Sequence, residues 1–270
     1  MPELPEVETI ARGLDAQVRG QHVQRVAVIT PSVVRVGDFS SLVGHTFTYV
    51  SRRAKLLLLH LDDSRILVFH LKMTGRVWLA GRDQVLPKHT HLVLTLASQD
   101  LLLFEDSRRF GFCGIFTQEQ LHHWSFFARL GPEPLECSPE TLAERLKGRK
   151  ARIKSLLLDQ TVVAGVGNIY ADESLFAAGI HPKSTAGNIP YDQLLTLCAS
   201  LQKVMIEAIR AGGSTISDYR NAYGHSGLFQ DQFLVYGKKG DPCPGCGQVL
   251  ETIKVAGRTS TFCSHCQVLY

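Results

Sequence analysis

Two pairs of cysteines near the C-terminus restrict what this chain can fold into more than any other feature of the sequence. Cys243 and Cys246 form one Cys-x2-Cys knuckle, and Cys263 and Cys266 form a second one after 16 intervening residues. Two knuckles at this separation are typical of a four-thiolate zinc site. Disulfides are the alternative, but no basic leader precedes an apolar run, so we expect a cytosolic protein in which disulfides are rare. The sequence therefore predicts one Zn²⁺, and because protein ligands fill all four positions, its role is structural.

Composition and charge favour a globular protein that can meet an acidic partner. The chain has 270 residues, 44% of them hydrophobic, and a mean hydropathy of +0.01. No apolar run approaches the ~20 residues of a membrane span, so we expect no membrane partner. The net charge of +4 permits a nucleic-acid partner without requiring one. Lys and Arg gather in four clusters, which favours a phosphate track: 52–55, 108–109, 149–154 and 238–239.

Hydrophobic periodicity divides the chain into a strand-rich part and a helix-rich part. Val7, Ile10, Leu14 and Val18 share one face of an expected N-terminal helix. Aliphatic and β-branched runs predict strands, with turns at 62–64 and 98–100, in the ranges 22–30, 46–61, 65–74, 91–97 and 101–105. From about residue 118 the period becomes helical, and Ser138 has N-cap chemistry. Further helices are expected over 152–159, 169–178 and 191–211. An α+β fold follows, with an antiparallel sandwich or barrel in the first part.

The start of the chain places an unusual nucleophile beside a carboxylate. Met1 is usually removed before a residue as small as proline, and Pro2 then carries a secondary α-amine that titrates near pKa ~8. Such an amine attacks a sugar aldehyde carbon to give an iminium, as lysine Schiff-base enzymes do, and Glu3 can move protons at the same centre. Helix initiation explains Pro5 well but leaves Pro2 and Glu3 unexplained.

A glycine-containing turn before the helix expected at 169–178 can bind an anion. Gly165 and Gly167 precede Asn168, so backbone N–H groups and the Asn168 amide can converge at the positive end of that helix. Taken alone, the pattern also fits a plain turn between two helices.

These blocks resemble the formamidopyrimidine-DNA glycosylase family of bifunctional base-excision repair enzymes. The start PELPEVET, the segment 164–172 and the hairpin 255–262 carry the resemblance, which covers nearly the whole chain. It implies an N-terminal β-sandwich catalytic domain with a flanking helix over 1–117 and a linker with a connecting helix over 118–134. A helix-two-turn-helix DNA-binding domain would follow over 135–228, and a four-cysteine zinc finger with a β-hairpin over 229–270.

The resemblance also implies roles for single residues. The catalytic positions of the family match Pro2, Glu3 and Lys55. A base must leave the stack before it can be excised, and the residues that would fill the hole are Met73, Arg108 and Phe110. The other candidate DNA contacts are His70, His89, Lys154, Asn168, Tyr236 and Arg258, with Lys154 linked to recognition of the damaged purine. Without the resemblance, His89 would be interpreted as a structural or surface histidine. The segment 212–230 resembles the loop that covers the everted base.

The expected activity is excision of oxidised purines, chiefly 8-oxoguanine and formamidopyrimidines, followed by β,δ-elimination at the abasic site. The expected partner is damaged double-stranded DNA, bound by a monomer in the bacterial cytoplasm and nucleoid. One alternative is the endonuclease VIII branch, which removes oxidised pyrimidines and usually begins PEGPE, whereas Leu4 stands here. Another is a non-catalytic zinc protein that binds damaged DNA, since a retained Met1 would hold the Pro2 nitrogen in an amide.

Overall fold

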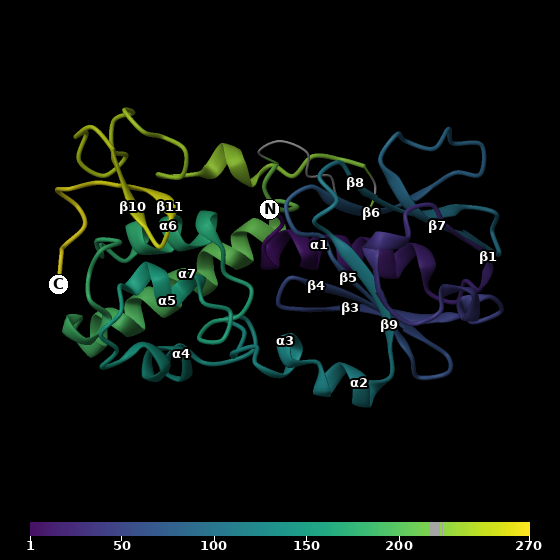
Figure 1. Cartoon of the computed structure of the whole chain (residues 1–270). Helices are drawn as coiled ribbons and strands as arrows, with labels where there is room; N and C mark the ends of the chain where they lie inside the picture. The colour runs from purple at the N-terminus through teal and green to yellow at the C-terminus, as the bar shows by residue number, and fades with distance from the viewer. Residues whose placement is uncertain (216–221, 223) are drawn as a thin grey trace. The chain divides into compact units, whose positions relative to one another are not determined.

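The computed structural model describes residues 1–215, 222 and 224–270, which form two compact units (Figure 1). Unit 1 comprises 1–128 and 211–230, and unit 2 comprises 129–210 and 231–270. The predicted domain limits at 117, 134 and 228 differ from these unit boundaries. Residues 216–221 and 223 of the expected covering loop lie outside the described residues. None of the described helices is long and apolar enough to cross a membrane.

Unit 1 is a sandwich of two sheets, as the sequence predicted. The four-stranded sheet has the order β1 (Val23–Val28), β7 (Thr90–Leu96), β8 (Leu101–Asp106) and β6 (Gly75–Ala80). The five-stranded sheet has the order β2 (Val34–Val36), β9 (Phe112–Phe116), β5 (Ile66–His70), β4 (Leu56–Leu61) and β3 (Phe47–Arg53). Two 3₁₀ turns, η1 (Pro31–Val33) and η2 (Phe39–Leu42), flank β2.

One helix completes the core of the sandwich. α1 (Leu4–Val18) buries its expected apolar face, and Val7, Leu14 and Val18 are 0% exposed. These side chains belong to one cluster with inward-facing residues of both sheets, such as Phe47 and Leu94. Because α1 is anchored along its whole length, the position of its first residues is fixed by the core.

Several elements differ from the sequence expectation. The single strand expected over 46–61 is a hairpin, β3 and β4, with Ala54 at φ +52° in its turn. Strands β2, β6 and β9 were not predicted, because they are short or contain glycine. The segment 118–134, where a linker with a connecting helix was expected, contains two short helices, α2 (Gln118–His123) and α3 (Ser125–Ala128). Trp124, Phe126 and Phe127 pack it onto the outer face of the five-stranded sheet.

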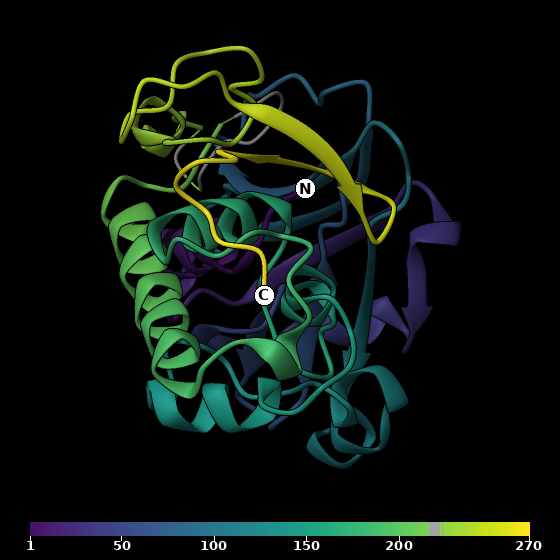
Figure 2. The same cartoon turned by 90° about the vertical axis from the view of Figure 1, so that its left-hand side faces the viewer.

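Unit 2 is helical with a terminal hairpin. Its helices are α4 (Pro139–Leu146), α5 (Ile153–Leu158), α6 (Asn168–Ala177) and α7 (Tyr191–Arg210), and η3 (Ala186–Asn188) is a 3₁₀ turn. As predicted, Ser138 caps α4 by accepting the Thr141 N–H at 3.3 Å. α7 packs against α4 and α6 (Figure 2). The hairpin pairs β10 (Glu251–Val255) with β11 (Arg258–Phe262).

The segment that follows α7 belongs to unit 1. Glu6 of α1 accepts hydrogen bonds from the backbone N–H and the hydroxyl of Ser214, both at 2.9 Å. The Phe229 N–H, at the start of η4 (Phe229–Gln232), donates to the Gly213 carbonyl at 3.0 Å. A Cβ at Gly227 would lie 2.1 Å from that same carbonyl oxygen, so only glycine fits there. The Glu6–Ser214 contacts, made between residues 208 positions apart in sequence, explain why 211–230 joins the sandwich.

Candidate active site and nucleic-acid interface

The N-terminal pair predicted to carry the chemistry lies at the beginning of α1. Glu3 is the N-cap residue and is 3% exposed, and its carboxylate accepts the Glu6 N–H. In return, Glu6 accepts the Glu3 N–H at 2.9 Å, which completes a capping box. Pro2 is buried, and its nitrogen is bonded to an exposed Met1. The fold therefore holds residues 2 and 3 in fixed positions, and loss of Met1 converts the Pro2 amide into an amine.

Lys55 lies in the turn between β3 and β4, His70 is the last residue of β5, and both are buried. Burial, and then the charges of Lys72 and Lys55, lower the pKa of His70 to about 3. The ring is therefore neutral at physiological pH. Its Nδ1 accepts the Lys72 N–H at 3.1 Å, so the proton is on Nε2. A neutral imidazole with a donor at Nε2 suits a phosphate oxygen.

The three residues predicted to replace an everted base come together in unit 1. The Arg108 Nη1 lies 3.2 Å from the Met73 sulfur, and the Arg108 guanidinium carbon lies 4.8 Å from the centre of the Phe110 ring. Met73 and Phe110 are 42% and 52% exposed, which is high for large apolar side chains. The group thus presents a thioether, a guanidinium and a ring to an incoming duplex.

One buried carboxylate organises the two loops that carry this group, and sequence reasoning missed it. Asp106 is 0% exposed and accepts hydrogen bonds from the Thr74 hydroxyl, from the Arg108 N–H at 3.1 Å and from the Gly111 N–H at 2.6 Å. His91 supports the same turn by contacting the Asp106 carbonyl at 2.8 Å. The Asp-x4-Gly spacing of Asp106 and Gly111 is the sequence feature that could have indicated this turn.

His89 is exposed, and no contact among the described residues assigns a role to its side chain. Its carbonyl accepts the Asp106 N–H at 3.0 Å, so its backbone belongs to the same loop system. The predicted DNA contact of His89 stays a prediction.

Lys154 occupies a different environment from the one expected of a residue that reads a damaged base. It is 0% exposed, and its ammonium donates to Asp172 at 2.6 Å, to the Ser260 hydroxyl at 2.6 Å and to the Thr259 carbonyl at 3.2 Å. Burial raises the pKa of Asp172 to about 6, against the opposing charge of Lys154. Three acceptors satisfy the three donors of the ammonium. Lys154 thus joins α5 and α6 to the hairpin.

Asn168 and Arg258 flank this buried ion pair. Asn168 is the first residue of α6, and its amide donates to the Thr259 carbonyl at 3.0 Å. Arg258 opens β11 directly after Ala256 and Gly257, whose φ values of +50° and +71° form the tight hairpin turn. Arg258 is exposed. The Asn168 contact holds β11 at Thr259, and therefore also the neighbouring Arg258, next to the positively polarised N-terminal end of α6.

Tyr236 is positioned by a second buried carboxylate that the sequence did not reveal. Glu173 is 2% exposed and accepts the backbone N–H groups of Leu234, Val235 and Tyr236 at 2.8, 2.9 and 2.7 Å. Three donors on one carboxylate fix the 234–236 backbone against α6.

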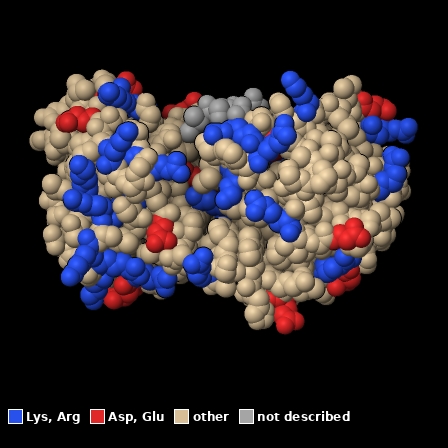
Figure 3. Space-filling view, in the orientation of Figure 1, with Lys and Arg blue, Asp and Glu red and all other residues tan. Residues whose placement is uncertain are grey.

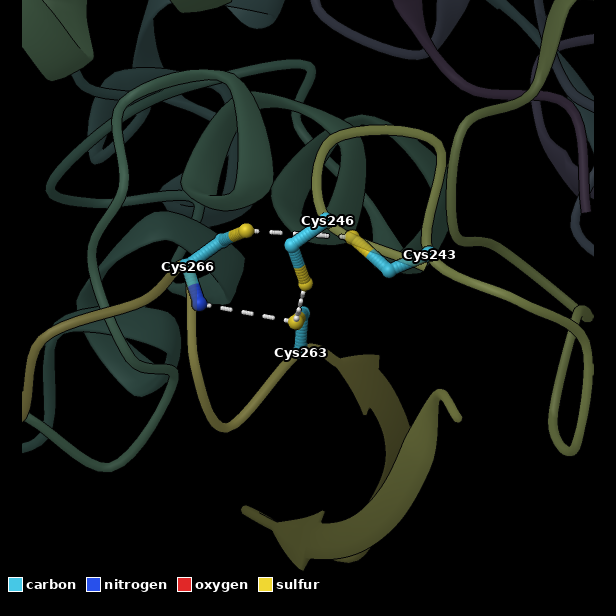
Figure 4. Close-up of side chains that lie close together, drawn as sticks. All are labelled: Cys243, Cys246, Cys263 and Cys266. Carbon is cyan, nitrogen blue, oxygen red and sulfur yellow. Dashed lines mark hydrogen bonds between the residues drawn. The ribbon is translucent and has the colours of Figure 1, made fainter. Parts of the chain in front are cut away.

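The four cysteines of the two knuckles converge as the spacing predicted (Figure 4). All four sulfurs lie within 4.8 Å of one another. The Cys243–Cys266 and Cys246–Cys263 sulfur distances are 3.8 and 3.5 Å. A disulfide needs ~2.05 Å, whereas a tetrahedral zinc with ~2.3 Å bonds sets its sulfurs about 3.8 Å apart. The cluster therefore fits one zinc ion, which would hold the hairpin to the chain that precedes it.

Positive charge is prominent on one face of the molecule. In the view of Figure 3, Lys and Arg side chains predominate over Asp and Glu on the surfaces of both units. Such surfaces attract the phosphate backbone of nucleic acids.

Family models match three consecutive parts of the chain. Residues 1–113 match the formamidopyrimidine-DNA glycosylase N-terminal domain, 130–220 its H2TH domain, and 240–268 a zinc finger found in FPG and IleRS. The fold and the cysteine cluster thus define a zinc-finger protein of the helix-two-turn-helix class.

Similar curated proteins and solved structures identify the family within this class. The chain is 43% identical to a formamidopyrimidine-DNA glycosylase of Desulforamulus reducens, over 99% of both chains. It is 44% identical to that of Solibacter usitatus, again over 99% of both. Complexes of Lactococcus lactis Fpg match with a TM-score of 0.92 over 98% of this chain and 99% of theirs. One holds DNA with an abasic site (36% identity), and the other holds DNA with N7-benzyl-Fapy-dG (37% identity). The chain belongs to the formamidopyrimidine-DNA glycosylase family.

Proposed function

We propose that this protein is a bifunctional DNA glycosylase and lyase that excises oxidised purines from duplex DNA. The observation that carries the proposal is the fixed start of α1, where the capping box buries Glu3 and holds Pro2 beside it. The family membership supplies the substrate class, since the matched Lactococcus lactis Fpg was solved with DNA that contains N7-benzyl-Fapy-dG and with DNA that contains an abasic site.

The chemistry of the proposed centre follows from an amine and a carboxyl group. After Met1 is lost, the Pro2 nitrogen attacks the anomeric carbon of the damaged nucleotide, and the base leaves with a proton supplied by Glu3. The attached Pro2 nitrogen then loses its proton and forms a double bond to the anomeric carbon, while the bond from that carbon to the ring oxygen breaks and the oxygen takes up a proton. The product is a ring-opened iminium ion. Proton removal from the neighbouring sugar carbon then expels the 3′ phosphate, and a second elimination expels the 5′ phosphate. Lys55 supports this centre from the β3–β4 turn.

DNA would be held by residues that bind phosphate and by residues that replace the everted base. His70, with its Nε2 proton, and Arg258, with its planar guanidinium, suit phosphate oxygens. Asn168 and Tyr236 are proposed phosphate contacts on unit 2. Met73, Arg108 and Phe110 would enter the stack, because their contacts with one another present them as one exposed group.

We propose that the protein acts as a monomer in the bacterial cytoplasm, on DNA of the nucleoid. The curated relatives come from bacteria, and one chain carries all the groups that the chemistry needs.

The proposal is tested by reductive trapping. Borohydride reduces an iminium to a stable amine, so it should link the protein covalently to DNA that carries 8-oxoguanine, and the linked peptide should begin at Pro2. A variant that retains a residue ahead of Pro2 should not be trapped, whereas Pro2→Gly retains a primary amine and serves as the control. A linked lysine peptide would assign the nucleophile elsewhere.

The role of Glu3 and the substrate class need separate measurements. Glu3→Gln preserves shape but cannot transfer a proton, so it should slow base removal by at least ~100-fold while duplex binding is retained. Faster removal of thymine glycol than of 8-oxoguanine in single-turnover reactions would contradict the purine assignment.

A further inference from the structure

Two cations that the proposed chemistry does not use share one aromatic ring in unit 1. The guanidinium carbon of Arg35 lies 5.1 Å from the centre of the Phe112 ring, and the ammonium of Lys72 lies 5.9 Å from it. Phe112 is buried, Arg35 is exposed and Lys72 is half-buried. The ring therefore forms the base of a positively charged surface.

The strand order explains why three residues distant in sequence meet here. Arg35 lies on β2, which pairs with β9, and Phe112 is the first residue of β9. β9 pairs on its other side with β5, where His70 stands opposite Phe112. Lys72 follows two residues after His70. The sheet thus places Arg35, His70 and Phe112, and Lys72 lies in the turn that follows β5.

In the part of the chain that the structure describes, no carboxylate compensates the charge of this pair. Among the described residues, neither Arg35 nor Lys72 forms an ion pair with a carboxylate. Burial and the nearby Arg35 charge lower the pKa of Lys72, as expected when two cations stand close together. Lys72 also has φ +51°, a left-handed backbone that costs a lysine roughly 1 kcal/mol. Such strain is typical of functional positions.

The ring also connects this pair to a proposed phosphate contact. The centres of the His70 and Phe112 rings are 5.5 Å apart. His70 is the residue whose Nε2 donor suits a phosphate oxygen. Arg35 and Lys72 therefore add two charges next to the His70 position, around the same pair of rings.

We infer that Arg35 and Lys72, supported by the Phe112 ring, bind one further phosphate of the DNA backbone. This inference rests on the proposed function. A phosphodiester fits because a single negative charge relieves the repulsion between the two cations, and because the guanidinium offers paired donors. The site reads no base, so it should act equally on damaged and undamaged duplex.

The test is the salt dependence of duplex binding by the full-length protein. Arg35→Gln should lower the slope of log affinity against log salt by about 0.9, which is a roughly eightfold loss at 0.1 M salt. Arg35→Lys should keep the slope, because the charge remains. Arg25→Gln is the matched control, since Arg25 is an exposed cation of the same unit on β1.

A double variant tests whether the two cations share one phosphate. Lys72→Met alone should also lower the slope, and Arg35→Gln with Lys72→Met should lose less than the product of the two single effects. An unchanged slope in Arg35→Gln, or fully multiplicative losses, would overturn the shared site. If the wild type excises 8-oxoguanine while Arg35→Gln binds like Arg25→Gln, only this inference fails. A wild type that neither excises nor is trapped would instead remove the proposed function.

Discussion

Replacement of Lys154 by methionine is expected to show that this residue positions the hairpin. The change removes a charge that is 0% exposed and has three acceptors, while the methionine side chain fills much of the same volume. Removing one partner of a buried ion pair costs about 3–5 kcal/mol, chiefly because the other charge stays behind. Here the group left behind is Asp172.

The pH dependence gives this prediction its sharpest form. In the variant, the Asp172 carboxylate can be neutralised by binding a proton. For a carboxyl group with the ordinary pKa of 3.8, protonation costs about 5 kcal/mol at pH 7.5 but only about 2 kcal/mol at pH 5.5. In Lys154→Met the folded-state pKa of Asp172 should rise above its present value of about 6. A raised acid pKa favours the folded state as pH falls, so the loss of stability should shrink between pH 7.5 and 5.5.

Urea unfolding of wild type and variant at both pH values measures the effect, with zinc content checked in each sample. Lys147→Met is the matched control, because its pair with Glu144 is more than half exposed and should contribute under 1 kcal/mol. Asp172→Asn combined with Lys154→Met should recover part of the loss. A cost below 1 kcal/mol, or one that is equal at both pH values, would refute the argument. Arg258→Ala should weaken DNA binding less in the Lys154→Met background, because the arginine is already displaced.

Three further outcomes follow from the described contacts. Metal analysis should give one zinc per chain, and Cys246→Ser should lose both the zinc and DNA binding because the local fold is lost; full binding after complete zinc removal would contradict this. Because the pKa of His70 is about 3 in the folded state, the unfolded state binds a proton at this histidine at a higher pH than the folded state does. Lowering the pH below 6.5 should therefore reduce the free energy of unfolding by up to about 1.4 kcal/mol per pH unit, and His70→Gln should weaken this pH dependence of stability. Excision of 8-oxoguanine in single-turnover assays should be faster opposite cytosine than opposite adenine. Arg108→Ala should reduce that difference, whereas Phe110→Ala should slow both duplexes alike.

Local patterns in the sequence predicted the elements whose formation depends on nearby residues. The apolar period of α1, the Ser138 cap and the turns at 62–64 and 98–100 are all present, with Ser64 and Gln99 at positive φ. The zinc cluster was also accessible, because ligand spacing within each knuckle is local. Loop residues Met73, Arg108 and Phe110 were recognised as a set, and they do meet.

Structural features that depend on contacts between residues far apart in sequence could not be predicted from local sequence patterns. The three-residue β2 has too little length for a period, and it exists because β9 pairs with it. Lys154 sits within a run of basic residues that is typical of a charged surface, yet the hairpin 105 residues away buries it. The placement of 211–230 in unit 1 likewise depends on one carboxylate in the first helix, Glu6.

Buried carboxylates explain how loops can carry the proposed functional groups with fixed geometry. Glu6, Asp106, Asp172 and Glu173 are each at most 2% exposed. Glu6, Asp106 and Glu173 accept backbone N–H groups from segments outside regular structure, and Asp172 accepts the Thr261 N–H of β11. A charged acceptor forms hydrogen bonds about twice as strong as a neutral one, and a buried carboxylate left without its donors is costly. Each segment therefore has one favoured position. The sequence shows these residues only as four acids among 25, because nothing local distinguishes a buried acid that collects distant N–H groups from a solvated one.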